Sequence, residues 1–143
     1  MISRISLEEV ELVRDRFLDF ARENGREMAL VILDEACEPI FVLRTEQCSA
    51  RVLAFAGRKA FTAAYMGRDT VTFREENIAK GKTLLDWGEP RLTQLSGGCP
   101  ITVEKQPYGA IGVGGGSSGI DADLARDLAE LVAARRARRL NDA

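Results

Sequence analysis

The pattern of hydrophobic and polar positions in the first third of the chain predicts one helix and one β-hairpin. Apolar residues recur every three or four positions after Ser6, which opens a Ser-x-x-Glu capping box, and Gly25 supplies a stop. These signals predict a helix over residues 7–24. The continuously apolar run 28–33 predicts a central strand, and residues 40–43 predict its hairpin partner after a polar turn.

The middle of the chain reads as two helices followed by irregular structure. Ser49 can cap a helix with an alanine-rich apolar side that ends at Gly67. Residues 72–75 form a second capping box, which predicts a short helix that stops at Gly81. After a turn rich in glycine and proline, residues 92–95 are predicted to form a short edge strand.

The last third predicts a hairpin, a glycine-rich loop and a final helix. The apolar runs 99–103 and 108–113 flank a polar break, and Asp121 is the predicted cap of the last helix. The element order α-β-β-α-α-β-β-β-α has hairpin connections and no βαβ alternation. It predicts a single α+β domain over residues 1–143, with an antiparallel sheet of about five strands flanked by helices.

Composition narrows the classes of function. A net charge of −2 gives no basic face for nucleic acid or for an anionic membrane surface, and no run approaches the roughly 18 apolar residues of a spanning helix. The three cysteines show no paired spacing, so neither a disulfide framework nor a zinc site is predicted. Free thiols and the absence of an apolar leader favour a soluble protein of the cytoplasm.

The chain contains no histidine. This excludes the commonest general base, the commonest transition-metal ligand and every Ser-His or Cys-His nucleophile pair. No metal site is predicted.

Four features could carry chemistry, and each also has a purely structural explanation. The loop after residue 113 formally satisfies G-x-G-x-x-G, but too little chain follows it for a dinucleotide-binding unit; an anion at the start of the last helix remains possible. Lys59 interrupts the alanine-rich helix, where it can snorkel, bind a carboxylate or carry a proton. Cys99, before Pro100, is either a core residue or a thiolate ligand. The arginines at 135–139 suit a helix C-terminus or a nucleic-acid patch.

The second half of the chain contains S-G-G-C-P-I at 96–101, Y-G-A-I-G-V-G-G-G at 108–116 and the later Asp121. Upstream are a K-A-x-T-A helix at 59–63 and the strand ending at Asp34. Together these motifs resemble the GlcG/HbpS family, which includes the C-terminal domain of PduO-type cobalamin adenosyltransferases. The resemblance implies a profilin-like or PAS-like domain, usually oligomeric, whose members include proteins that bind haem or corrinoid-related cofactors.

The sequence departs from the family pattern at two places. The turn 34–38 lacks the family's two glycines and its histidine-like position, and Gly114 replaces a serine. Because the chain has no histidine, haem ligation through that residue type cannot be carried over, and the cofactor stays unknown. A bound haem would need Cys99, Cys37, a tyrosine, a methionine or no strong axial ligand.

The resemblance and the residues together predict a small-molecule-binding protein and homo-oligomer, with a haem-like or other anionic organic ligand. The walls predicted for its pocket are the 97–100 turn, the glycine loop and one helix face, with the residues Gly97, Gly98, Cys99, Pro100, Gly114, Gly115, Gly116, Lys59 and Thr62. The alternative is a small cofactor-independent lyase, isomerase or hydrolase acting on a small carboxylate, with Lys59 or Asp34 as proton carrier. A third hypothesis is a structural or regulatory subunit whose ligand is another protein.

Overall fold

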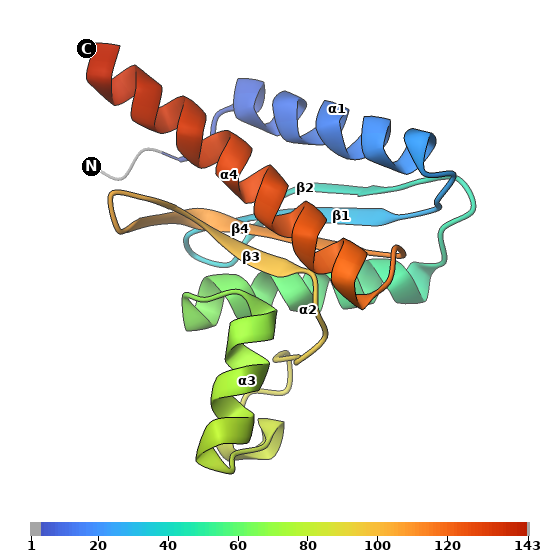
Figure 1. Ribbon diagram of the computed structural model, residues 1–143, viewed down its shortest axis with the longest axis vertical. Coiled ribbons are helices and arrows are strands. Elements are labelled where there is room, and N and C mark those ends of the chain that lie inside the picture. Colours follow the sequence, from blue (N-terminus) through green and yellow to red (C-terminus); the bar gives the residue numbers. More distant parts are fainter. Residues whose placement is uncertain (1–3, 143) are drawn as a thin grey trace.

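The structure, a computed structural model, describes residues 4–142 as a four-stranded antiparallel sheet with helices on both faces (Figure 1). Its elements in chain order are α1 (Leu7–Glu23), β1 (Ala29–Asp34), β2 (Pro39–Arg44), α2 (Ala50–Met66), α3 (Thr70–Lys80), the 3₁₀ helix η1 (Leu84–Trp87), β3 (Gly98–Val103), β4 (Gln106–Gly114) and α4 (Ser118–Asp142).

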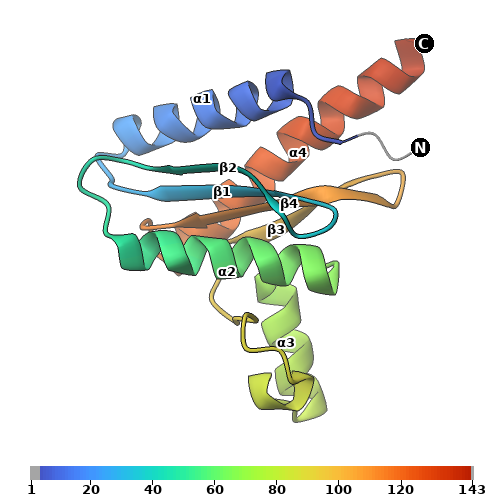
Figure 2. The same ribbon diagram turned by 180° about the vertical axis from the view of Figure 1, so that it is seen from behind.

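The sheet has the strand order β2-β1-β4-β3, so two hairpins meet along the central pair β1 and β4. Helices α1 and α4 cover one face, and α2 covers the other (Figures 1 and 2). Helix α3 and η1 extend away from the sheet beyond α2. The α+β class and the antiparallel sheet predicted from the sequence are therefore confirmed.

Side chains of β1 alternate between two hydrophobic cores because successive residues of a strand point to opposite faces. Leu30 and Ile32 join the core under α1 and α4, around the fully buried Phe17 and Leu128. On the other face, the core under α2 contains Ala29, Val31, Leu33, Ala56, Ala60 and Phe73. All six β1 residues are buried, and the first five belong to the apolar run 28–33 that predicts a covered strand.

Helix α2 lies so close to the sheet that two strand positions have no room for a side chain. A Cβ atom built on Gly112 would lie 2.1 Å from the carbonyl oxygen of Ala56, and one on Gly98 would lie 2.2 Å from that of Lys59. Since real Cβ contacts are much longer, only glycine fits. The alanines of α2 and the glycines of the hairpin are two halves of one packing contact.

The predicted fifth strand is wrong. Residues 92–95 have no regular secondary structure and pair with no strand of the described sheet. Their backbone bonds to side chains instead: the N–H of Thr93 donates to the Thr62 hydroxyl at 2.9 Å, and that of Leu95 donates to Thr93 Oγ1 at 3.2 Å. These two N–H groups thus bond to side-chain oxygen atoms and not to the backbone of a neighbouring strand.

Two predicted helix caps are also corrected. Helix α3 starts at Thr70, because Asp69 is the N-cap and its carboxylate accepts from the N–H of Thr72 at 2.9 Å. Helix α4 starts at Ser118, so Asp121 lies inside its first turn. The capping box at Ser6 and Glu9 is confirmed, with both reciprocal hydrogen bonds present.

Among the described helices, none is long and apolar enough to cross a bilayer.

Candidate functional site

The strongest candidate site is a groove of about 350 Å³ where the glycine loop meets α2 and the start of α4. We call it the glycine-loop groove. Its walls are Val52, Phe55, Lys59, Leu95, Ser96, the loop 114–118 and Asp121. One side is apolar, and the other consists mainly of loop backbone.

Lys59 lies at the base of this groove and is almost fully buried, with 5% of its surface exposed. It shares the inner face of α2 with Ala56, Ala60 and Ala63, so the helical period points it toward the sheet. Its Nζ donates to the carbonyl oxygen of Val113 at 2.9 Å and to Asp121 Oδ2 at 3.3 Å. The ammonium group is thus paired with a carboxylate inside the protein.

Asp121 holds the loop, α2 and α4 together. Its Oδ1 accepts a hydrogen bond from the N–H of Gly116 at 2.9 Å, while its other oxygen accepts from Lys59. A carboxylate in the first turn of a helix is also favoured by the positive end of the helix dipole. The predicted N-cap is instead an anchor between three segments.

Close contacts require glycine at position 115 and crowd positions 114 and 116. Gly115 has a φ of 101°, and a Cβ there would lie 2.5 Å from the carbonyl oxygen of Glu27. A Cβ on Gly116 would lie 2.6 Å from Asp121 Oδ1, and one on Gly114 would lie 3.1 Å from Val52 Cγ1. The absence of side chains at these three positions therefore lets the loop backbone approach the groove closely.

The start of α4 leaves backbone donors available beside the groove. The first intrahelical bond runs from the N–H of Asp121 to the carbonyl oxygen of Ser117 at 2.8 Å. Within residues 4–142, no group accepts from the three preceding N–H groups, those of 118–120. An ammonium group has three N–H donors, and Lys59 uses two. These groups can bind the oxygen atoms of an anion.

The structure brings only part of the predicted pocket into this groove. Lys59, Gly114, Gly115 and Gly116 line it. Gly97 lies just behind, where a Cβ would lie 3.0 Å from Asp121 Cβ and 3.1 Å from Lys59 Cδ. Gly98 packs on the α2 backbone.

Thr62 has a structural environment. It is fully buried; its hydroxyl donates to the carbonyl oxygen of Arg58 at 2.8 Å and accepts from Thr93. The Thr62 hydroxyl therefore already donates one hydrogen bond to the backbone and accepts one from it. Thr62 is not among the residues that line the groove.

Cys99 and Pro100 line a different cavity of about 470 Å³, between β3, α4 and the start of α3. Burial raises the pKa of the Cys99 thiol to about 12, with a smaller contribution from the negative charge of Asp69. A thiol with so high a pKa stays protonated near neutral pH, which weakens it as a ligand or a nucleophile.

Asp34 lies at the opposite end of β1 from the glycine-loop groove. It is paired with Gly109, whereas Ala29, at the other end of β1, is paired with Gly114. Its Oδ1 accepts from the N–H groups of Ala36 at 2.9 Å and Glu38 at 3.0 Å, which closes the β1–β2 turn. Asp34 and Lys59 do not share a site within one chain.

Sequence reasoning missed the apolar wall of the groove. Val52 and Phe55 precede Lys59 by seven and four positions, so all three lie along one helix face. The spacing of Val52, Phe55 and Lys59 could have predicted this wall. No sequence pattern predicts that Leu95 and Ser96 line the groove, because their position depends on the irregular segment after η1.

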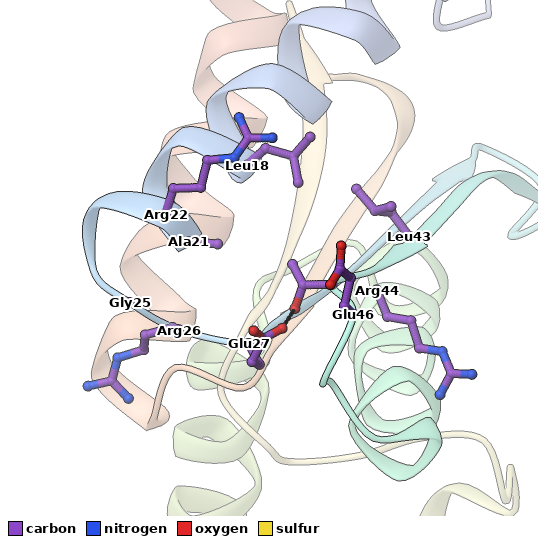
Figure 3. Close-up of a pocket in the computed structure, with 10 residues that line it drawn as sticks. Leu18, Ala21, Arg22, Gly25, Arg26, Glu27, Leu43, Arg44 and Glu46 are labelled. Carbon is purple, nitrogen blue, oxygen red and sulfur yellow. Dashed lines mark hydrogen bonds between the residues drawn. The ribbon is translucent and has the colours of Figure 1, made fainter.

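A second groove, of about 480 Å³, lies between the end of α1 and strand β2 (Figure 3). Leu18 and Leu43 form part of its apolar lining, while the side chains of Arg26 and Arg44 point away. Glu27 is held by the Thr45 hydroxyl and by the N–H of Gln47. The residues predicted for the site do not line this groove.

Comparison with known proteins gives one consistent relationship. The family model described as haem degrading protein HbpS-like matches residues 5–130. Protein GlcG of Escherichia coli K12 is 31% identical over 93 residues, which are 65% of this chain and 68% of GlcG.

Two solved structures are similar over nearly the whole chain. A double mutant of HbpS from Streptomyces reticuli superposes with a TM-score of 0.81 at 27% identity, covering 92% of this chain and 89% of HbpS. A structure called the PduOC:heme complex superposes with a TM-score of 0.81 at 18% identity, covering 91% of this chain and 96% of that chain. At such identity the second likeness shows the fold alone.

Proposed function

Because this chain belongs to the GlcG/HbpS family, we propose that it is a small-molecule-binding protein with an anionic organic ligand in the glycine-loop groove. A haem-like molecule is the first candidate and a smaller carboxylate the second. The observation that carries the proposal is the convergence of three features on one groove: the start of α4 at Ser118, the Lys59 ammonium group, and an apolar wall.

Ligand charge follows from the balance of charges in the groove. Lys59 and Asp121 cancel one another, so the groove carries no net formal charge from side chains. The partial positive charge of the α4 N-terminus therefore favours a ligand with a negative charge. An acidic group at these N–H donors and an apolar body against Val52 and Phe55 satisfy both walls.

Relatives support the choice of haem as the first probe. The family description concerns haem degradation, and the PduOC structure is a complex with haem. The cavity volume of about 350 Å³ is near the lower end for ligand pockets, so a haem would be partly exposed to solvent or covered by a second molecule. Cys99 lines another cavity, so thiolate ligation has no support.

Catalysis on a small carboxylate has weaker support. Lys59 is engaged by Val113 and Asp121, and Asp34 closes a distant turn. The geometry favours binding over proton transfer.

The test uses Ser118, the first residue of α4. Proline is tolerated at the first helical position, so Ser118→Pro removes the N–H of a residue that lines the groove and preserves the helix. Ser118→Ala is the matched control, because it removes the hydroxyl alone. Haemin is titrated by absorbance and small carboxylates by calorimetry.

We expect saturable binding that Ser118→Pro weakens about tenfold relative to Ser118→Ala, since a hydrogen bond to a charged group contributes roughly 1.5–3 kcal/mol. Phe55→Ala should weaken binding as well, whereas Tyr65→Ala, an exposed aromatic of the same helix outside the groove, should not. Equal affinities of the two Ser118 variants, or the absence of saturable binding, would overturn the proposal.

A further inference from the structure

A separate cavity of about 290 Å³ lies where the start of α1 meets β4 and the C-terminal half of α4. Its described walls are Arg4, Ser6, Tyr108, Arg136, Arg139 and Leu140. Three guanidinium groups are found among these lining residues, and each has a glutamate of the surrounding protein within 4 Å. We call this the arginine cavity.

Arg136 forms a rigid floor for the arginine cavity. Its Nε and Nη2 donate to the two carboxylate oxygens of Glu9 at 2.8 and 2.7 Å, and Nη2 also donates to the carbonyl oxygen of Arg4. Glu9 is 1% exposed, and the guanidinium of Arg136 lies over the ring of Tyr108 at 4.5 Å. These bonds use the Nε and Nη2 donors of Arg136, so this side chain shapes the floor of the cavity and leaves the binding of a ligand to the rim.

Arg4 and Arg139 form an exposed rim with weak partners. The Arg4 side chain is 74% exposed and approaches Glu35 only to 3.9 Å, beyond hydrogen-bond distance. Arg139 makes one hydrogen bond of 3.2 Å, to a Glu8 oxygen that Arg135 also contacts. Exposed pairs of this kind contribute little to stability, so both guanidinium groups can turn toward a stronger anion.

We propose that the arginine cavity binds the phosphate group of a small phosphate monoester. The guanidinium groups of the rim, those of Arg4 and Arg139, each present a planar fork of N–H donors that matches a phosphate bidentately, and a dianion pairs with both arginines at once. The exposed Leu140 supplies an apolar edge for the organic part of the ester. The run of arginines that the sequence places at a solvated helix end is, in this proposal, a binding site.

The test is calorimetric titration of the full chain with phenyl phosphate at low ionic strength, where charge-assisted contacts are least screened. Variants Arg4→Gln and Arg139→Gln each remove one arm of the rim. The matched control is Arg138→Gln, because Arg138 is a neighbouring exposed arginine of α4 that does not line the cavity.

We expect one site per chain, with affinity reduced about tenfold by Arg4→Gln and by Arg139→Gln and less than about twofold by Arg138→Gln. Unchanged melting temperatures would show that the variants are folded. Equal losses in all three variants would mean non-specific charge attraction, and binding that survives both rim substitutions would place the phosphate elsewhere. Either result, or the absence of saturable binding at about 10 mM ligand, overturns the proposal. None of these outcomes depends on the glycine-loop groove.

Discussion

Lys59 and Asp121 are 62 residues apart in the sequence, yet their charged groups meet at 3.3 Å with about 6% of each side chain exposed. This buried pair joins α2 to the start of α4 and orients the loop that forms the glycine-loop groove. Structure and candidate site therefore depend on the same two side chains.

Removing either partner of this pair should destabilise the fold strongly. Lys59→Met leaves the Asp121 carboxylate buried without its cation, which costs about 3–5 kcal/mol. The double variant with Asp121→Asn should recover much of that loss, because no unpaired charge remains. Urea unfolding of the single and double variants measures the coupling. The exposed pair Arg16 and Asp127 is the control, and Arg16→Met should cost less than about 1 kcal/mol.

Substitution of Gly112 by alanine should disrupt the contact between α2 and the sheet. The new Cβ would lie 2.1 Å from the Ala56 carbonyl oxygen, so the helix must shift, and we expect a loss of more than about 2 kcal/mol. Gly57→Ala is the control in the same region: no atom lies within 4 Å of its Cβ, and alanine in a helix gains about 0.5–1 kcal/mol over glycine. Thermal unfolding should show opposite shifts, and a drop of equal size in both would contradict the packing argument.

Glu9 should contribute to acid unfolding. Burial alone would raise its pKa, but hydrogen bonds from Arg136 and Ser6 outweigh burial and lower the pKa below the ordinary glutamate value. A carboxylate with a depressed folded-state pKa stabilises the protein above the unfolded pKa, about 4.3, and loses that contribution as the pH falls through the folded value. The free energy of unfolding of Glu9→Gln should therefore depend less steeply on pH below about 4.3. Superimposable pH profiles would show that another group controls the acid limb.

The Cys99 thiol should be nearly inert. With a pKa of about 12, it is almost entirely protonated at pH 8, so alkylation by iodoacetamide should be at least about a hundredfold slower than for an unperturbed thiol. Mass spectrometry of native and urea-unfolded protein measures the difference. If haemin binds, Cys99→Ala should leave its spectrum unchanged; a lost Soret shift would restore the thiolate hypothesis.

Local sequence signals were sufficient for most of the fold. The capping box at Ser6 and the glycine stops at Gly67 and Gly81 act within one or two helical turns, so the chain on either side determines them. The prediction of a strand at 92–95 is wrong because the N–H groups of Thr93 and Leu95 bond to the hydroxyl groups of Thr62 and Thr93 and not to another strand. Hydrogen bonds to side-chain hydroxyl groups do not produce a periodic sequence pattern that could have revealed them.

The candidate site was only partly readable from the sequence for a related reason. Lys59 and the loop glycines were recognisable, since a charge on an apolar helix face and consecutive glycines are both unusual. Which of these residues share a groove depends on the register between β1 and β4, which pairs Ala29 with Gly114 and Asp34 with Gly109. Spacing along the chain does not reveal that register, so Asp34 and Lys59 could be assigned to one pocket.

The strand order β2-β1-β4-β3 also determines when the protein can fold during synthesis. One edge of β1 pairs with β2, but the other can form its hydrogen bonds only after β4 has been synthesised. Gly109 of β4, which pairs with Asp34, is synthesised 75 residues after it. At about 5–20 residues per second, translation leaves the first hairpin with an unsatisfied edge for roughly 4–15 seconds. The nascent chain is therefore most vulnerable to aggregation before its last hairpin leaves the ribosome.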